Sequence, residues 1–186
     1  MVSYKIIIGD NDERFLDVIK SKLLQIGHIV LDVDTSGTGL LRKIRSLSPD
    51  IVIADVNLKG LTGFEIAEII EGENICPCII SLKGDAFQYK LNFSRKKVKT
   101  YLKKPVDYNE INHIIKHALN EFNNSLKDDK KSKEKQIVNE AKTLLMNKYK
   151  ISEDEAYKYI RKKSMEKGIN MYKLSLMLID IIKKRN

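Results

Sequence analysis

The amino-acid sequence predicts an α/β domain built on a doubly wound parallel sheet, followed by a small all-helical domain. Short apolar runs alternate with segments of helical periodicity over roughly the first 120 residues. Several of these runs end at an acid, an amide or a hydroxyl, where parallel strands place their functional groups. The last third of the chain has helical periodicity only and carries most of the positive charge.

The clearest strand covers residues 51–54, an uninterrupted apolar run of Ile, Val, Ile and Ala. Such a run is typical of a strand that is buried on both faces of a parallel sheet. It ends at Asp55, and Asn57, Gly60 and Gly63 follow in the next loop. Ligands of open α/β sheets bind at this end of the strands, so Asp55 is the first candidate functional residue. The alternative is that Asp55 only caps the following helix.

The other elements continue the alternation. Further strands are predicted over 5–9, 28–33, 77–81 and 99–102, and helices over 15–24, 40–47, 66–70, weakly over 85–94, and from a capping-box variant at 107–110 onward. Five β–α units of this kind predict a parallel sheet with helices on both faces. Right-handed crossovers would bring the carboxyl ends of the first, third, fourth and fifth strands to one edge.

The positive charge is concentrated near the carboxyl end. The formal net charge of the chain is +9. Residues 1–124 hold 17 Lys and Arg against 16 Asp and Glu, whereas residues 125–186 hold 17 against 9. This asymmetry favours a neutral module joined to one that binds a polyanion. The alternative is a helical surface whose lysines only face solvent.

No apolar run approaches the roughly 20 residues that span a bilayer, and the amino terminus lacks the apolar core of a signal peptide. We therefore expect a cytoplasmic protein without a membrane partner. Cys76 and Cys78 have neither CxxC spacing nor a His/Cys cluster around them, so we expect buried thiols rather than a redox pair or a zinc site.

The predicted sheet edge gathers oxygen-bearing side chains and one ammonium group: Asp10, Asn11, Asp55, Asn57, Ser81 and Lys104. Carboxylate and carbonyl oxygens suit Mg²⁺, and a carboxylate can attack a phosphoryl group to form an aspartyl phosphate. A metal ion and Lys104 would neutralise the phosphoryl oxygens, and the Ser81 hydroxyl could reach for the new phosphate. The amphipathic ring of Tyr101 is suited to moving between buried and exposed positions.

Residues 4–122 resemble the receiver domain of two-component response regulators, which has a flavodoxin-like fold. The matched features are Asp10, Asp55 with Gly63 eight residues later, Ser81, Tyr101 and Lys104-Pro105. The resemblance implies that Asp55 is the phosphoacceptor and that Lys104 precedes a cis proline. It also implies a relay from Ser81 through Tyr101, and phosphorylation by a sensor histidine kinase.

The same resemblance implies a Mg²⁺ site. Asp10 would bind the ion through water, while position 11, Asp55 and the backbone carbonyl of Asn57 would be direct ligands. Asn11 stands where the family has an acid, so we expect weaker Mg²⁺ binding, although Asp12 is adjacent and could supply the missing charge. Leu82 replaces the small residue that usually follows the hydroxyl, which could restrict access to the phosphate.

Three segments in the last third resemble the ANTAR domain of transcription antiterminators. They are Ala141–Met146, Ser152–Tyr157 and Ile160–Met165, with Leu174 beyond them. Members of that family bind RNA stem-loops in leader transcripts and prevent a terminator from forming. Unpaired loop bases stack on aromatic rings or guanidinium groups while lysines meet the phosphates. The candidate RNA-binding residues are Lys142, Ser152, Tyr157, Arg161, Lys162 and Lys163.

These observations predict a receiver domain over residues 1–122, a linker or helical extension over 123–135, and a three-helix RNA-binding domain over 136–186. The predicted function is a phosphorylation-controlled antiterminator that dimerises through residues 107–145, and not an enzyme. Four alternatives remain: a DNA-binding regulator, a receiver that is only a phosphorylation-independent dimerisation platform, a helical dimerisation module in place of the RNA-binding domain, and a phosphatase with Asp55 as its nucleophile.

Overall fold

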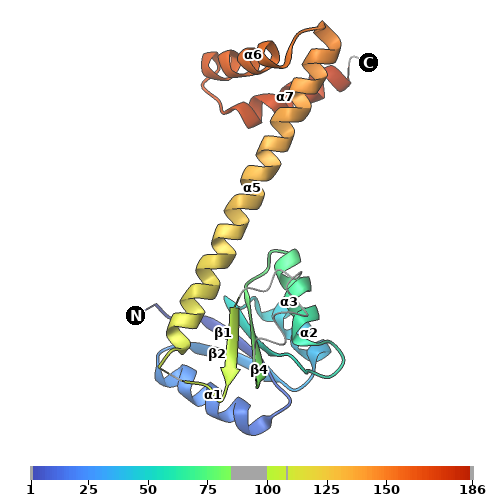
Figure 1. The fold of residues 1–186 in the computed structure, drawn as a ribbon. Helices are drawn as coiled ribbons and strands as arrows, with labels where there is room; N and C mark the ends of the chain where they lie inside the picture. Colours follow the sequence, from blue (N-terminus) through green and yellow to red (C-terminus); the bar gives the residue numbers. More distant parts are fainter. Residues whose placement is uncertain (1, 85–99, 108, 185–186) are drawn as a thin grey trace. The chain divides into compact units, whose positions relative to one another are not determined.

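The computed structural model describes residues 2–84, 100–107 and 109–184 (Figure 1). The chain divides into two compact units, residues 1–124 and residues 125–186. The helix predicted weakly over 85–94, and Lys99 of the predicted fifth strand, lie outside the described residues.

The first unit contains a five-stranded parallel sheet in the order β2-β1-β3-β4-β5. The strands are β1 (Lys5–Gly9), β2 (Ile29–Asp34), β3 (Ile51–Asp55), β4 (Cys78–Lys83) and β5 (Thr100–Lys104). All five residues of β3, the central strand, are buried, as its continuous apolar run predicts. The predicted α/β fold class is confirmed.

Helices cover both faces of the sheet (Figure 1). On one face α2 (Gly37–Leu47) and α3 (Gly63–Gly72) pack over a core that includes Val52, Phe64 and Ile80. On the other face α1 (Glu13–Gln25) and the start of α5 (Ile111–Tyr149) pack over alternate strand residues. Successive side chains of each strand point to opposite faces of the sheet and therefore contribute to two separate cores.

β4 and β5 end two residues later than their sequence patterns predict. Leu82 pairs with Lys103, and Lys83 pairs with Lys104, so the ladder continues past the apolar run. The hydroxyl of Ser81 suggested an earlier end for β4, but backbone pairing decides where a strand stops. The extension places Lys83 and Lys104 side by side at the edge where the candidate site lies.

α5 is a single helix of 39 residues that includes the predicted segment 123–135. That segment is almost wholly polar, but it has neither Gly nor Pro and is rich in Lys, which favours helix. The helix ends at Tyr149, and Lys150 follows with a positive φ of 55°.

The second unit adds α6 (Glu153–Glu166) and α7 (Met171–Lys183) to the end of α5. Each begins at a side-chain cap, Ser152 for α6 and Asn170 for α7. Their small core consists of Ala141, Leu145, Ala156, Ile160, Leu174 and Ile182. The predicted three-helix region is confirmed. No helix among the described residues is long and apolar enough to cross a membrane.

Gly63 supports the loop that carries Asp55, and a substitution there should destabilise the first unit. A Cβ at Gly63 would lie 2.5 Å from the backbone oxygen of Asp55, so the backbone would have to shift. We expect Gly63→Ala to lower the free energy of unfolding by about 1–3 kcal/mol, the usual cost of overpacking. Urea titration followed by circular dichroism measures this change.

Gly72, at the end of the same helix, provides the matched control. A Cβ at Gly72 would meet nothing within 4 Å, and its φ is not positive. Gly72→Ala should therefore leave stability unchanged or raise it by less than about 1 kcal/mol. Equal losses for the two variants would contradict the close approach at Gly63.

Candidate functional site

A polar groove of about 740 Å³ opens at the carboxyl edge of the sheet. Its lining comes from the ends of β1, β3, β4 and β5 and from the start of α1: Asp10, Asn11, Asp12, Glu13, Arg14, Asp55, Asn57, Lys83 and Lys104. Four carboxylates and three basic groups thus share one groove. The predicted convergence of strands one, three, four and five at this edge is what brings them together.

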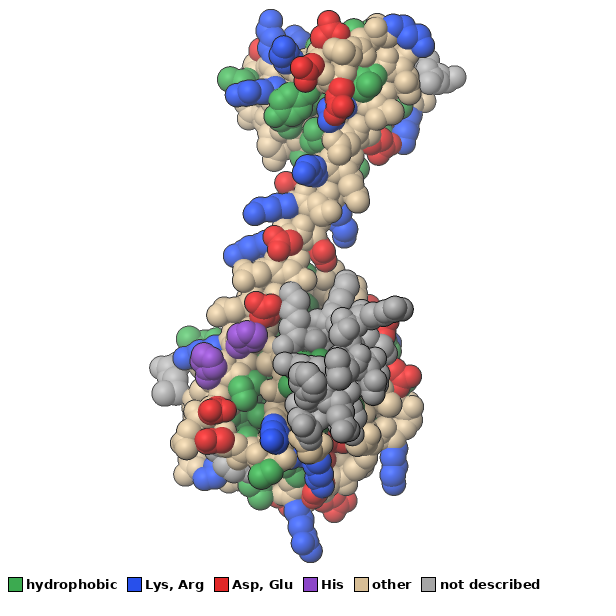
Figure 2. Space-filling view, in the orientation of Figure 1, with side chains coloured by type: hydrophobic (Ala, Val, Ile, Leu, Met, Phe, Trp, Pro, Cys, Tyr) green, Lys and Arg blue, Asp and Glu red, His purple; other side chains and the backbone are tan. Residues whose placement is uncertain are grey.

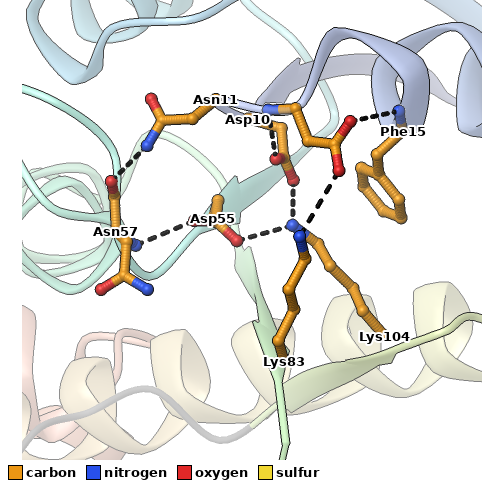
Figure 3. A network of polar contacts seen from close by, with 8 residues as sticks. Asp10, Asn11, Phe15, Asp55, Asn57, Lys83 and Lys104 are labelled. Atoms are coloured by element: carbon orange, nitrogen blue, oxygen red, sulfur yellow. Dashed lines mark hydrogen bonds and ion pairs between the residues drawn. The ribbon is translucent and has the colours of Figure 1, made fainter.

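Lys104 joins the two acids at the base of the groove (Figure 3). Its Nζ donates a hydrogen bond to Asp55 Oδ1 at 2.6 Å and another to Asp10 Oδ2. The side chains of Lys104, Asp10 and Asp55 are 5%, 2% and 10% exposed. Removing one partner of such a buried pair leaves an uncompensated charge, so these three groups depend on one another. The Lys104–Pro105 peptide bond is cis, as the resemblance implies.

The Asp10 carboxyl is the more deeply buried of the two acids. Burial raises the pKa of Asp10, and the hydrogen bonds from Lys104 Nζ and from the backbone N–H of Asp12 partly oppose that rise. Because the ammonium group of Lys104 lies against both carboxylates, the groove provides its own compensating cation.

Asn11 and Asn57 form a second link across the groove (Figure 3). The Asn11 amide donates from Nδ2 to the backbone oxygen of Asn57. The backbone N–H of Asn57 in turn donates to Asp55 Oδ2 at 3.0 Å. The backbone carbonyl of Asn57, which the resemblance assigns to Mg²⁺, therefore already accepts a hydrogen bond from Asn11, the residue that replaces an acid.

The donor set of the groove nevertheless fits Mg²⁺. Asp10 and Asp55 provide carboxylate oxygens, Asn57 provides a backbone oxygen, and rotation of the Asn11 amide would present its own oxygen. Among the described residues there is no group of three or more His, Cys, Asp and Glu side chains that could hold a metal ion. A bound Mg²⁺ would thus rely on two carboxylates, completed by neutral oxygens and water.

Ser81 lies beside the phosphoacceptor candidate. It is in register with Asp55 in the adjacent strand, and its hydroxyl is fully buried without a hydrogen-bond partner in the described part of the chain. Tyr101 is half-buried against the α2/α3 core, 6.5 Å from the Phe64 ring centroid, and burial raises its pKa. Tyr101 is in register with Ile80, which lies in the same core, so its ring belongs to that face of the sheet.

Lys83 and Arg14 line the groove without a role assigned from the sequence, and the sequence suggests Asp12 there only as a source of the charge that Asn11 lacks. Lys83 Nζ lies 3.4 Å from Asp12 Oδ2, and the other oxygen of Asp12 accepts a hydrogen bond from the backbone N–H of Phe15. That capping bond lowers the pKa of Asp12. Asp12 therefore lines the groove but is held by α1 and by Lys83. The sequence feature that could have identified Lys83 as a groove residue is its position two residues after Ser81, at the end of a strand.

The predicted RNA-binding residues of the second unit divide into engaged and exposed groups. Lys142 forms a 2.6 Å ion pair with Glu153, which ties α5 to the start of α6. The Ser152 hydroxyl accepts from the backbone N–H of Glu155 and donates to its carboxylate, so its contacts are those of a capping box. Lys163 pairs with Glu166 at 2.7 Å.

Tyr157, Arg161 and Lys162 face solvent on α6. Tyr157 is 43% exposed, so its ring is not part of the core of this unit. Within the described residues, Arg161 has no side-chain hydrogen bond or ion pair. On the face shown in Figure 2, hydrophobic side chains of this unit lie exposed among Lys, Arg, Asp and Glu.

Two family models match the chain. The response regulator receiver domain matches residues 6–116, and the ANTAR domain matches residues 129–179. Among curated proteins, the heme response regulator HssR of Staphylococcus aureus (strain Newman) is 27% identical over 117 residues, which cover 63% of this chain and 52% of HssR. The chain thus spans about half the length of the curated relatives it matches.

Solved structures share the fold of the first unit. The signal receiver domain of a modulated diguanylate cyclase from Desulfovibrio desulfuricans G20 has a TM-score of 0.60 at 22% identity, covering 67% of this chain and 99% of that one. The receiver domain of sensor histidine kinase PA1611 from Pseudomonas aeruginosa PAO1, with a magnesium ion in its active-site cleft, has a TM-score of 0.55 at 21% identity. It covers 64% of this chain and 99% of that one.

Both matched domains are regulatory rather than enzymatic, and the receiver model alone covers more than half of the chain. The protein therefore belongs to the two-component response regulators, with an amino-terminal receiver domain and a carboxyl-terminal ANTAR domain.

Proposed function

We propose that this response regulator is a cytoplasmic RNA-binding antiterminator whose activity is controlled by phosphorylation of Asp55. The observation that carries the proposal is the presence, in one chain, of a receiver match over residues 6–116 and an ANTAR match over residues 129–179. The groove at the sheet edge supports the input half of the proposal, and the exposed side chains of Tyr157, Arg161 and Lys162 on α6 support the output half.

The receiver groove suits phosphoryl transfer from a phosphohistidine of a sensor kinase. An oxygen of Asp55 attacks phosphorus while the bond from phosphorus to the histidine nitrogen breaks and the imidazole leaves. Asp10, Asp55, Asn57 and the reoriented Asn11 amide would hold Mg²⁺, which would supply positive charge for the phosphoryl oxygens. Lys104 already lies 2.6 Å from Asp55, so its ammonium needs little movement to do the same.

The buried Ser81 hydroxyl would gain its hydrogen-bond partner from the phosphoryl group. A buried hydroxyl without a partner costs about 1–3 kcal/mol, so a new acceptor favours the phosphorylated state. Tyr101 borders this part of the sheet, and its movement would pass the change to the surface on which a second copy docks. Two ANTAR domains held together would bind paired hairpins more tightly than one domain alone.

A second candidate is an antiterminator whose receiver is only a dimerisation platform. The observation that favours it is the hydrogen bond from Asn11 to the Asn57 oxygen, because the amide removes a charge and engages a metal ligand. DNA binding through α6 and α7 has no comparable observation in its favour. A phosphatase of this type would need a second acid two residues after Asp55, and the residue there is Asn57, which disfavours this function.

The experiment that tests the proposal compares RNA and DNA binding with and without phosphorylation. A fluorescent hairpin RNA with a short unpaired loop, and duplex DNA of the same stem sequence, are titrated with the full chain treated with acetyl phosphate and Mg²⁺. We expect tighter binding to the RNA, an increase in affinity on phosphorylation, and a dimer in light scattering with beryllofluoride. Equal RNA affinity of the phosphorylated and unphosphorylated protein would favour a receiver that is only a dimerisation platform. Tighter binding to the duplex DNA than to the RNA would refute the RNA proposal.

Arg161 should contribute more to RNA binding than Lys163, although the two lie two residues apart on α6. The Arg161 side chain has no partner within the described residues, whereas Lys163 is paired with Glu166. We expect Arg161→Ala to raise the dissociation constant for the hairpin about tenfold, which is the usual effect of losing one stacked or charge-assisted contact. Lys163→Ala should raise this dissociation constant no more than about threefold.

Fluorescence anisotropy at several salt concentrations measures both effects. The wild-type affinity should fall steeply as salt rises, because binding releases counterions from the RNA. Equal losses for the two variants would instead indicate a diffuse electrostatic surface without specific contacts.

A further inference from the structure

A second groove lies in the ANTAR unit, where α5, α6 and the start of α7 meet. Its volume is about 410 Å³, at the lower end of the range of about 300–1,000 Å³ for small-ligand sites. It is lined by Lys131, Glu134, Lys135, Val138, Tyr157, Asn170, Met171 and Tyr172. A groove of this size suits a single nucleotide rather than a helix of a partner protein.

The walls of the groove are apolar and aromatic. Tyr157 comes from α6, Met171 and Tyr172 come from the first turn of α7, and Val138 comes from α5. Val138, Met171 and Tyr172 are half-buried, and Tyr157 is 43% exposed. Aromatic faces that remain open to solvent in a groove are suited to stacking with a base, because every base has a planar apolar face.

The charged side chains of the groove differ from others in the same unit. Lys131 and Lys135 lie one turn apart on α5 with Glu134 beside them, and none of the three has an ion pair within the described residues. By contrast, Lys142 and Lys183 are each paired with a glutamate. The two lysines at the groove are thus free to meet a phosphate, and the half-buried Glu134 carboxylate is free to accept a hydrogen bond.

We propose that this groove holds one unpaired nucleotide of the bound RNA, an inference that rests on the proposed RNA-binding function. The base lies against the rings of Tyr157 and Tyr172, and its phosphate lies near Lys131 and Lys135. Glu134 accepts a hydrogen bond from an exocyclic amine of the base. Adenine and cytosine present such an amine beside a ring nitrogen acceptor, whereas uracil has none, so the groove favours an amine-bearing base.

The test uses the full chain and two hairpin RNAs that share one stem and have loops of adenines or of uridines. Tyr157→Ala and Tyr172→Ala should each weaken binding of the adenine-loop hairpin about tenfold, the usual loss of one base–aromatic contact. Tyr159→Ala is the matched control, because Tyr159 is on the same helix, is 42% exposed and does not line the groove. Tyr157→Phe and Tyr172→Phe keep the ring and should bind as the wild type does.

The preference for the base is tested by a second pair of variants. The wild type should bind the adenine loop about tenfold more tightly than the uridine loop, and Glu134→Gln should reduce this ratio to about threefold or less. Asp129→Asn removes a carboxylate from the exposed surface of the same helix and should leave the ratio unchanged. Circular dichroism of each variant checks that the three helices still form.

Four results would overturn the proposal. If the wild type binds the hairpins tightly but Tyr157→Ala and Tyr172→Ala do so equally well, the groove does not hold RNA, while RNA binding itself stands. If Tyr159→Ala loses as much affinity as they do, the effect does not belong to the groove. If Tyr172→Ala changes the mass in light scattering but not the RNA affinity, the groove is a protein contact. If the wild type binds neither hairpin, the proposed function fails together with this inference.

Discussion

Asp55→Asn should abolish the incorporation of phosphate from acetyl phosphate. The amide has no anionic oxygen to attack phosphorus, so no aspartyl phosphate forms. Asn is nearly the same size, and its one amide oxygen can still accept from Lys104 Nζ, whereas the amide nitrogen in place of Oδ2 cannot accept from the backbone N–H of Asn57. Circular dichroism of the variant checks that it stays folded, so that the loss reports on chemistry rather than on misfolding. Intact-protein mass spectrometry after incubation with Mg²⁺ measures the added phosphoryl group.

Two controls make that result specific. Asp17→Asn changes an exposed carboxyl on α1 outside the groove and should leave the mass gain intact. Removal of Mg²⁺ with a chelator should slow the wild-type reaction, because the phosphoryl oxygens would lose the positive charge of the metal. A mass gain that survives in Asp55→Asn would show that another residue accepts the phosphate.

The sequence was sufficient to predict the fold because its local and tertiary preferences agree. The apolar run of β3 is buried on both faces, and the helices start at side-chain caps such as Thr62 and Ser152. The placing of Asp10, Asp55 and Lys104 at one edge follows from right-handed crossovers. These features depend on residue type and spacing, which the sequence displays directly.

Features that depend on the direction of a side chain were not predictable in this way. The sequence shows that Asn11 replaces an acid, but only the three-dimensional arrangement shows its amide donating to Asn57. Lys83 was missed because β4 continues beyond Ser81 through pairing with β5, a tertiary effect. Tyr172 joins Tyr157 at one groove because α6 and α7 fold back on α5, which no local pattern encodes.

Asn11→Asp should tighten Mg²⁺ binding by about tenfold or more. The variant adds a third carboxylate to a site that has two, and affinity for a hard cation rises with the charge of its ligands. Without metal, the new carboxylate would face the Asn57 oxygen to which the Asn11 amide now donates, so the metal-free variant should be less stable than the wild type. Metal binding would reverse this order, because the free energy gained grows with the ratio of Mg²⁺ concentration to the dissociation constant.

Thermal unfolding over a series of Mg²⁺ concentrations measures both effects. The melting temperature of Asn11→Asp should start below that of the wild type and rise above it as the metal concentration increases. Asn57→Asp is the matched control: it adds the same charge to the same groove, but position 57 would bind metal through its backbone oxygen, so its gain should be smaller. Equal gains for the two variants would mean that only the total charge of the groove matters. No gain for Asn11→Asp would mean that the side chain at position 11 does not reach the metal.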